Sequence, residues 1–279
     1  MTPPLTSLVN ERLLAGRTAF VTGGGSGVNL AIATAFATLG ADVSICGRSE
    51  ERLLGAAAGL RELGARVVTS VADVRDRAAV QAAFDRTADE LAPCDIVVCG
   101  AAGNFLAPAE SLSSNGFRAV VDIDLLGSFH AAHAAFEQLR QTRGSLLFVS
   151  GGQSLMPFEL QAHVGAAKAG VDSLMRSLAL EWGRHGIRVN SIVPGPVAGT
   201  EGMARLADHT GEDLWNDMVP LGRFATAEEI AQLAVVLVSP LASYVSGAQV
   251  VVDGGMALTG TGRFNQAVRA AFTASGNGA

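Results

Sequence analysis

Short runs of consecutive apolar residues alternate along this chain with longer segments of helical periodicity. Unbroken apolar runs of this length are typical of strands buried on both faces of a parallel sheet. Seven strand-like, mainly apolar runs lie at residues 18–22, 42–46, 66–71, 96–99, 145–149, 188–192 and 249–252. Helical patterns occupy residues 30–39, 50–63, 77–91, 114–141, 163–184 and 227–237. The alternation predicts an α/β fold in which helices cover both faces of a doubly wound parallel sheet with right-handed crossovers.

No internal repeat or low-complexity linker divides the chain, so we expect one domain over residues 1–279. The Gly- and Pro-rich stretch 194–200 leads into a polar segment, and we interpret residues 198–219 as a mobile lid. Residues 1–13 and 262–279 are interpreted as terminal tails.

The composition of the chain argues against several classes of function. The 279 residues carry a net charge of −6, which argues against a nucleic-acid partner because phosphate binding needs clustered Lys and Arg. Cys46, Cys94 and Cys99 lie in or beside strand-like runs, so we expect buried thiols rather than disulfides or a metal site. No stretch has the length of a membrane span or a signal peptide, and the last residues carry no S-K-L address. We therefore expect a cytoplasmic protein without a membrane partner.

A glycine-rich turn, TGGGSGVN at residues 22–29, follows the first strand and opens a helix. Glycines at such a turn let the backbone approach a pyrophosphate, which the helix N-terminus binds through free N–H groups and its dipole. The alternative is a tight structural turn with no ligand. The dinucleotide interpretation assigns cofactor contacts to Thr22, Gly23, Gly25, Ser26, Gly27 and Val28.

The ends of the later strands extend the predicted cofactor site. Arg48 and Ser49 follow the second strand, where an arginine suits the 2′-phosphate of NADP(H) and an acidic residue would suit NAD. A solvated surface arginine is the alternative. Asp73 could bond the adenine amino group. The other predicted contacts are Val74 after the third strand, Ala101, Ala102 and Gly103 after the fourth, and Pro194, Gly195, Val197 and Thr200 after the sixth.

Together with Lys168 and Asp253-Gly254-Gly255, these motifs resemble the short-chain dehydrogenase/reductase superfamily over about residues 14–258. The resemblance implies a single Rossmann-type domain that binds NADP(H). One departure is Asn29, at a position where the glycine pattern has glycine. Asparagine tolerates unusual backbone angles, and its amide could contact phosphate.

Three of the four acid/base positions implied by the resemblance are changed. The superfamily places a tyrosine four residues before the lysine, and a phenol and an ammonium at that spacing share one helix face. Here that position is Val164, and the single tyrosine of the chain is the distant Tyr244. The serine position falls on Gly151 rather than Ser150. The asparagine position falls on Asp124, and only Lys168 is retained.

A second resemblance is narrower. The segments GAAGNFLAPA at residues 100–109, DID at 122–124 and GPVAGTEG at 195–202 are similar to the 2,4-dienoyl-CoA reductase branch, in particular its peroxisomal form. That form also lacks the tyrosine, carries a histidine five residues before the lysine and has an aspartate at the Asp124 position. The resemblance implies an acyl-thioester substrate, acyl-CoA by analogy.

The implied chemistry sends hydride to carbon and leaves negative charge on the thioester oxygen, which needs hydrogen-bond donors rather than a phenol. Under this hypothesis Asn104 donates to that oxygen, and Asp124, directly or through water, delivers the proton. Lys168 binds the nicotinamide ribose hydroxyls and supplies positive potential. The alternatives are a turn residue for Asn104 and a structural acceptor for Asp124.

Other side chains near this centre have weaker assignments. His163 is expected at the substrate rim or in solvent, because it lies about 140° around the helix from Lys168. Phe105, Met156 and Phe158 could line an acyl channel, and Arg205 could meet CoA phosphates.

Two other functions stay open from the sequence. One is an alcohol or 3-oxoacyl dehydrogenase with an acid other than tyrosine. The other is a catalytically silent NADP(H)-binding sensor or partner subunit. By resemblance we also expect a homo-oligomer, a tetramer built on the helical segments 114–141 and 163–184.

Overall fold

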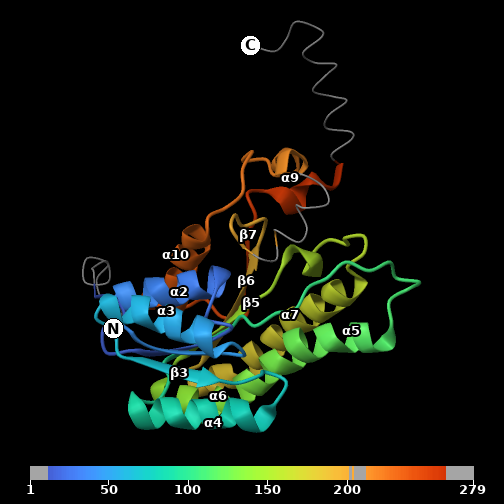
Figure 1. Ribbon diagram of the computed structural model, residues 1–279. Coiled ribbons are helices and arrows are strands. Elements are labelled where there is room, and N and C mark those ends of the chain that lie inside the picture. The colour runs from blue at the N-terminus through green and yellow to red at the C-terminus, as the bar shows by residue number, and fades with distance from the viewer. Residues whose placement is uncertain (1–11, 201–202, 204–211, 262–279) are drawn as a thin grey trace, which may run out of the picture.

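Seven parallel strands in the order β3-β2-β1-β4-β5-β6-β7 form the centre of the molecule (Figure 1). The computed structural model describes residues 12–200, 203 and 212–261. The strands are β1 (Thr18–Thr22), β2 (Asp42–Gly47), β3 (Val67–Val71), β4 (Ile96–Cys99), β5 (Ser145–Val149), β6 (Arg188–Pro194) and β7 (Gln249–Val252). All seven predicted strands and the doubly wound Rossmann-type sheet are therefore confirmed.

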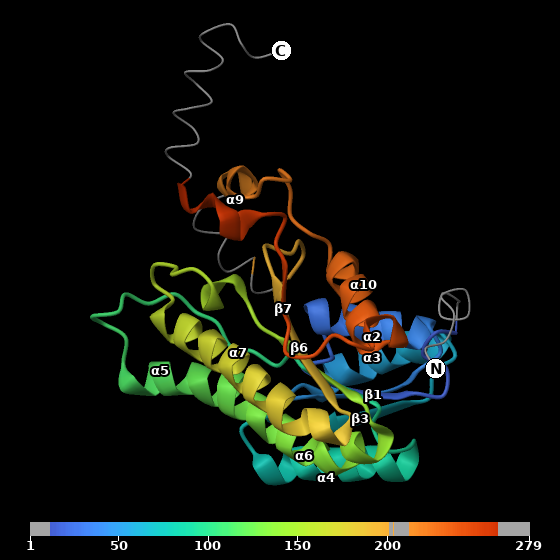
Figure 2. The ribbon, with the colours of Figure 1, turned by 180° about the vertical axis from the view of Figure 1, so that it is seen from behind.

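Helices cover both faces of the sheet, as the two opposite views in Figures 1 and 2 show. One layer holds α2 (Gly27–Thr38), α3 (Glu50–Glu62) and α10 (Ala227–Val238). The other holds α4 (Arg77–Glu90), α6 (Gly127–Thr142) and α7 (Ala162–Trp182), with α5 (Ser114–Val121) against α7. Successive strand residues enter opposite cores because side chains alternate along a strand: Ala19 and Val21 pack in the α2 layer, and Phe20 between them packs in the α4 layer.

The predicted helix over residues 114–141 is present and runs without a gap from Ser114 to Thr142, but it contains one irregular turn. A π-helical turn (Asp122–Leu126) separates α5 from α6, and the Gly127 N–H donates to the carbonyl of Asp122, five residues back. Single π turns inside a helix often lie at functional sites. This one contains Asp124, whose side chain is buried. A π turn holds one residue more than an α-helical turn. The sequence gives no sign of this extra residue, because the helical periodicity on either side continues across it.

Two other boundaries differ from the prediction. Helix α2 begins at Gly27 rather than at residue 30, so the end of the glycine-rich turn is already helical. A short helix, α9 (Glu212–Met218), lies within the segment interpreted as a lid. Its Trp215 packs with Val219 and Met256 in a small apolar cluster.

The chain reverses its winding between β1 and β4. These two strands are neighbours, yet β2 and β3 lie on one side and β5 to β7 on the other. In open α/β sheets a crevice forms at this switch point, outside the carboxyl ends of the strands, and ligands bind there. The turn after β1 and the loop after β4 both lie at this edge, which is where the predicted cofactor residues concentrate.

The three cysteines are free and buried, as predicted. Desolvation raises the pKa of Cys46 to about 12 and also raises the pKa of Cys94 and Cys99, so these thiols act as packing groups. Among the described helices, none combines the length and the apolar character needed to cross a membrane. Most of the predicted tails, Arg205 and most of the middle of the predicted lid lie outside the described residues.

Candidate functional site

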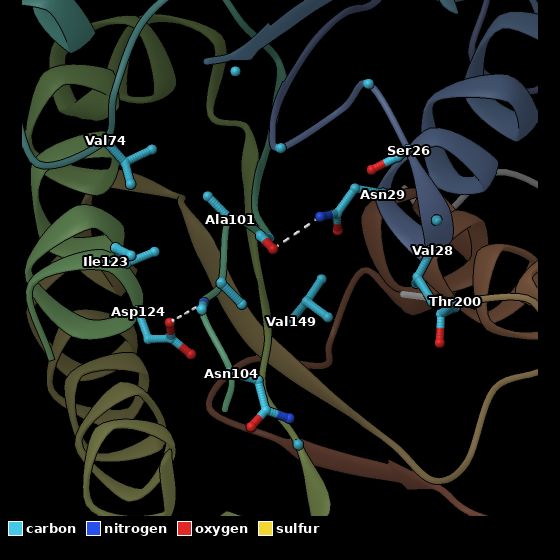
Figure 3. A pocket seen from close by; sticks show the side chains of 18 of the residues that line it. Ser26, Val28, Asn29, Val74, Ala101, Asn104, Ile123, Asp124, Val149 and Thr200 are labelled. Atoms are coloured by element: carbon cyan, nitrogen blue, oxygen red, sulfur yellow. Dashed lines mark hydrogen bonds between the residues drawn. The ribbon is translucent and has the colours of Figure 1, made fainter. Parts of the chain in front are cut away.

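A cavity of about 530 Å³ lies at the carboxyl ends of the strands. Its lining contains every residue predicted for the site except Thr22: Gly23, Gly25, Ser26, Gly27, Val28, Arg48, Ser49, Asp73, Val74, Ala101, Ala102, Gly103, Asn104, Asp124, Lys168, Pro194, Gly195, Val197 and Thr200. Figure 3 shows Ser26, Val28 and Thr200 on one side of this cavity and Val74, Ile123 and Asp124 on the other. Residues far apart in the chain therefore meet around one space.

The start of helix α2 presents backbone donors to the cavity. Ser26 is the N-cap residue, but its side chain makes no capping hydrogen bond. Gly27 has a φ of +57°, a conformation that glycine adopts without strain. The first N–H groups of a helix have no partner within it, so this terminus can bind an anion such as a pyrophosphate. The residues present thus fit a dinucleotide.

Thr22 does not line the cavity and has a structural role beside it. Its Oγ1 accepts hydrogen bonds from the N–H groups of Gly100 at 2.9 Å and Ala101 at 3.2 Å. The side chain is buried and also donates to the carbonyl of Val98. Thr22 therefore holds the loop after β4 against the end of β1. A direct cofactor contact by its side chain is not supported.

The contacts of Asn29 account for an asparagine at a position where the glycine pattern has glycine. Its Nδ2 donates to the carbonyl of Gly100 at 2.8 Å, the contact drawn in Figure 3. A Cβ placed on Gly100 would lie only 2.0 Å from Asn29 Oδ1, so glycine at position 100 makes room for the amide. The amide contacts this loop where the sequence suggested phosphate. Asn29 Oδ1 is buried and has no hydrogen-bond partner among the residues that the structure describes.

The predicted 2′-phosphate end of the cavity carries exposed cationic and hydroxyl groups. Arg48 and Ser49 lie at its edge, with Arg52 on the first turn of α3 beside them. Asp73 faces the same space but pairs with Arg75 at 2.6 Å. The hydrogen bond from Arg75 lowers the pKa of Asp73, opposed by partial desolvation, and the charges of Arg75 and Arg48 add to the lowering. This end therefore suits an anionic group better than a neutral ribose.

The inner end of the cavity is organised by a buried ion pair. Lys168 Nζ lies 3.1 Å from Asp124 Oδ2, and the side chains are 9% and 0% exposed. Asp124 Oδ1 accepts from the N–H of Gly103 at 2.7 Å, while Lys168 Nζ donates to the carbonyl of Val149 at 3.1 Å. The structure thus brings the predicted acid and the retained lysine together. Asp124 is also a structural acceptor, the alternative interpretation of this residue.

The other two altered positions surround the pair. Val164 is 2% exposed and lines the cavity without closing it. Gly151 lines the same space. The neighbouring Ser150 donates its hydroxyl to Asp172 Oδ2 at 2.8 Å and is committed to that buried contact. The site therefore has neither a tyrosine nor an available serine hydroxyl at the positions that the superfamily uses.

The prediction that His163 faces the rim or solvent is wrong. The residue is fully buried, and its ring packs against Phe105 with centroids 4.3 Å apart. Neither ring nitrogen makes a hydrogen bond of ordinary geometry in the described part of the chain. Desolvation lowers the pKa of His163, against smaller opposing effects of the Phe105 backbone and the Asp124 charge. The angle between His163 and Lys168 around their helix did not predict this burial, because the loop carrying Phe105 covers the ring.

Apolar side chains gather beside the inner end of the cavity. Phe158 stacks on Trp215 at 6.4 Å, and Met156 packs in the same cluster, consistent with a predicted acyl channel. Met203 belongs both to this cluster and to the lining of the cavity. Phe105 does not join them and packs on His163 instead.

Several lining residues were missed by sequence reasoning. Arg52, Ile123, Gln153 and Met203 all face the cavity. The position of Arg52, three residues after Ser49 at a helix start, was a signal available in the sequence. Gln153 offered no such signal, because its orientation depends on contacts that only the fold creates.

Comparison with known proteins agrees with this arrangement. Residues 23–257 match the family described as Enoyl-(Acyl carrier protein) reductase. The chain is 42% identical to the peroxisomal 2,4-dienoyl-CoA reductase of Saccharomyces cerevisiae, (3E)-enoyl-CoA-producing, over 89% of this chain and 87% of the relative. It is 37% identical to a probable 2,4-dienoyl-CoA reductase of Bacillus subtilis, (2E)-enoyl-CoA-producing, over 84% and 94%.

Solved structures are similar as well. An NADPH-bound short-chain oxidoreductase from Pseudomonas aeruginosa, described as containing an atypical catalytic center, has a TM-score of 0.80 at 30% identity. The similarity covers 86% of this chain and 96% of that one. The fold of this chain is therefore similar to that of an oxidoreductase solved with NADPH.

Proposed function

The chain belongs to the short-chain dehydrogenase/reductase superfamily, in its 2,4-dienoyl-CoA reductase branch, and from this premise we propose that it reduces a conjugated dienoyl or enoyl thioester with NADPH. Acyl-CoA is the proposed substrate class. The observation that carries the proposal is one cavity in which Asn104, Asp124 and Lys168 meet the glycine-rich turn.

The cofactor proposal is NADP(H). Arg48, Ser49 and the start of α3 supply cationic and hydroxyl groups where the 2′-phosphate would lie. Arginine binds phosphate with a planar fork of N–H donors, which a ribose hydroxyl does not need. Lys168 is proposed to bind the nicotinamide ribose hydroxyls, and the bound NADPH supplies a hydride. The NADPH-bound relative of known structure supports this assignment.

The chain's own residues would control where the negative charge goes. Hydride addition to the far end of the conjugated system leaves an extended enolate whose charge rests largely on the thioester oxygen. Donors aimed at that oxygen lower the barrier because they are already oriented before the charge develops. We assign this role to the side-chain amide of Asn104. An apolar Val164 in place of a phenol costs little here, since no alcohol oxygen exchanges a proton.

Protonation of the enolate completes the reaction. The Asp124–Lys168 pair is proposed to deliver the proton to carbon, directly or through water, while the Gly103 N–H holds the carboxylate in place. Protonation next to the thioester gives a 3-enoyl product, and protonation two carbons further along gives a 2-enoyl product. The two relatives named above differ in this same respect.

An assay with NADPH and 2,4-hexadienoyl-CoA tests the proposal. Loss of the dienoyl chromophore together with NADPH oxidation is the expected result. Turnover of 3-oxoacyl-CoA alone would contradict it and favour the dehydrogenase alternative. Tight NADPH binding without turnover of either substrate would favour the silent sensor. A homo-oligomer and a cytoplasmic location stay predictions, and several relatives are named as peroxisomal.

A further inference from the structure

A carboxylate that has no part in the proposed reaction lies buried one helical turn beyond Lys168. Asp172 follows Lys168 by four residues on α7, so the two side chains share one face of that helix. Asp172 is 1% exposed. Its Oδ2 accepts from the hydroxyl of Ser150 at 2.8 Å and from Nε2 of Gln249 at 2.6 Å, whereas Oδ1 has no hydrogen-bond partner among the described residues. Burial of a carboxylate is costly when its oxygens are not all satisfied, so the contacts that hold it call for a physical explanation.

Asp172 and Gln249 hold both ends of the loop that follows β5. Gln249, on β7, donates from Nε2 to Ser154 Oγ at 3.1 Å as well as to Asp172. Because a carboxamide nitrogen carries two hydrogens, these two contacts use both of them. Ser150 is bonded at the start of the loop and Ser154 at its end, and Gly151 between them lines the cavity. The loop is therefore fixed against α7 and β7 where it borders the cavity.

The peptide unit between Val149 and Ser150 connects this anchor to the lysine. Its carbonyl, on Val149, accepts from Lys168 Nζ at 3.1 Å. Its N–H, on Ser150, donates to the carbonyl of Ile192 on β6 at 2.8 Å. A peptide unit is planar, so its carbonyl and N–H turn together. The contact of the Ser150 side chain with Asp172 therefore limits how this peptide, and with it the acceptor of Lys168, can turn.

The direction of the lysine ammonium depends on its partners. The side chain of Lys168 is a flexible four-carbon stem with three N–H donors at its end. Two of these donors are directed at the Val149 carbonyl and at Asp124 Oδ2, each at 3.1 Å. The third is left for a ligand in the cavity, and its direction follows from the positions of the other two acceptors.

From these contacts we infer that Asp172 is a positioning residue for Lys168. Asp172 anchors Ser150, the anchored peptide keeps its orientation, and the Val149 carbonyl directs the ammonium toward the nicotinamide ribose. Asp172 does not itself line the cavity, so it acts through the lysine. The inference rests on the proposed function in one respect, because the binding of the ribose by Lys168 is part of that proposal.

Asp172→Ala and Ser150→Ala each remove the anchor. Each should weaken NADPH binding, measured by fluorescence titration, by about tenfold, the scale of one hydrogen bond to a charged group. The kcat should fall in both. In Asp172→Asn the amide oxygen can still accept from Ser150, so affinity and kcat should stay near those of the wild type; losses as large as those of Asp172→Ala would contradict the inference. Ser177→Ala, on the exposed face of α7, is the matched control for the serine variant and should change neither quantity.

A double-mutant cycle with Lys168→Met separates positioning of the lysine from general support of the fold. If Asp172 acts through the lysine, Asp172→Ala added to Lys168→Met should weaken NADPH binding no further. A merely structural role predicts that the two losses multiply, and that result would overturn the inference. Ser150→Ala takes the place of Asp172→Ala in the cycle if the latter folds poorly, because it removes the same hydrogen bond and leaves the carboxylate with Gln249. Thermal midpoints show which variants are folded.

The outcomes separate this inference from the proposed function. A wild type that binds NADPH but does not reduce 2,4-hexadienoyl-CoA contradicts the proposed function, while the affinity cycle still decides the role of Asp172. A wild type that reduces this substrate, with multiplied losses in the cycle, contradicts the role of Asp172 and leaves the proposed function standing. Unchanged NADPH affinity in both Asp172→Ala and Ser150→Ala also contradicts that role.

Discussion

At the scale of single residues, the site is defined by which hydrogen-bonding groups are already committed to partners. Asp124 is fixed by Gly103 and Lys168, whereas Val164 supplies no proton at all. The retained lysine and the substituted aspartate could be identified from the sequence as a pair of candidates. Their 3.1 Å contact could not, because it depends on the π-helical turn that brings Asp124 toward the loop after β4.

Asp124→Asn tests the proposed proton donor. The amide keeps the shape and can still accept from Gly103, but it cannot form the charged pair with Lys168. We expect kcat to fall by roughly 10²-fold or more, the scale of general acid catalysis. Asp122→Asn, in the same π-helical turn, is the control and should retain activity. Steady-state kinetics with NADPH binding measured in parallel separates lost catalysis from lost folding; full activity in Asp124→Asn would remove it from the reaction.

Arg48→Asp tests the cofactor preference. Replacing a cation by an anion beside the proposed 2′-phosphate should weaken NADPH binding far more than NADH binding, since NADH lacks that phosphate. Titration of both nucleotides against both proteins measures the ratio. Arg176→Asp on α7 carries the same charge change outside the cavity lining and should leave the ratio as in the wild type. Equal losses for NADPH and NADH in Arg48→Asp would contradict the assignment.

At the scale of elements, the apolar runs predicted the strands closely, whereas helix ends and interruptions depended on tertiary contacts. The strand 18–22 was predicted to the residue, because a strand buried on both faces has consecutive apolar residues, here Ala19 to Val21 between two threonines. The π turn at residues 122–126 was missed, since π turns leave no mark in hydrophobic periodicity. Gly127 is required there by packing, as a Cβ would lie 2.6 Å from Val74 Cγ2.

Helix α10 supports the layer that carries the cofactor turn. Its N-terminus has a capping box in which Thr226 Oγ1 accepts from the Glu229 N–H at 3.2 Å and Glu229 accepts from the Thr226 N–H at 2.9 Å. Thr226→Ala removes the cap and should lower the free energy of unfolding by about 1 kcal/mol. Thr226→Ser keeps a hydroxyl and should recover most of it. Chemical denaturation measures both, and equal stabilities for the Ala and Ser variants would show that the box contributes nothing.

At the scale of the whole molecule, a buried histidine couples stability to pH. Desolvation lowers the pKa of His163 below its ordinary value of 6.5, so the folded chain binds its proton less readily than the unfolded chain. The folded chain therefore keeps this contribution to its stability at pH values above 6.5. It loses the contribution as the pH falls from 6.5 towards the lower pKa of His163 in the folded chain. Unfolding of the wild type should become easier in this window.

His163→Leu removes the titrating group and should flatten this pH dependence, whatever its effect on stability at neutral pH. His133→Gln on the exposed face of α6 should retain the slope of the wild type. Denaturation midpoints between neutral and mildly acidic pH give the comparison. Parallel slopes for His163→Leu and the wild type would exclude His163 as the source.

The fold class, the sheet and most of the cavity lining could thus be predicted from the sequence, because strand runs and glycine turns are local patterns. The contact of Asn29 could not be predicted, since its partner Gly100 lies far away in the chain. His163 was misplaced for the same reason. Functional detail here depends on contacts between loops at the carboxyl edge of the sheet.

Transfer of deuterium from NADPH that carries deuterium at both C4 positions tests the central claim most directly. With 2,4-hexadienoyl-CoA as substrate, we expect one deuterium on C5 of the acyl product, located by mass spectrometry and NMR, because hydride goes to the far end of the conjugated system. A product without deuterium in the acyl chain, or label appearing only when a 3-oxoacyl-CoA is reduced at C3, would contradict the account.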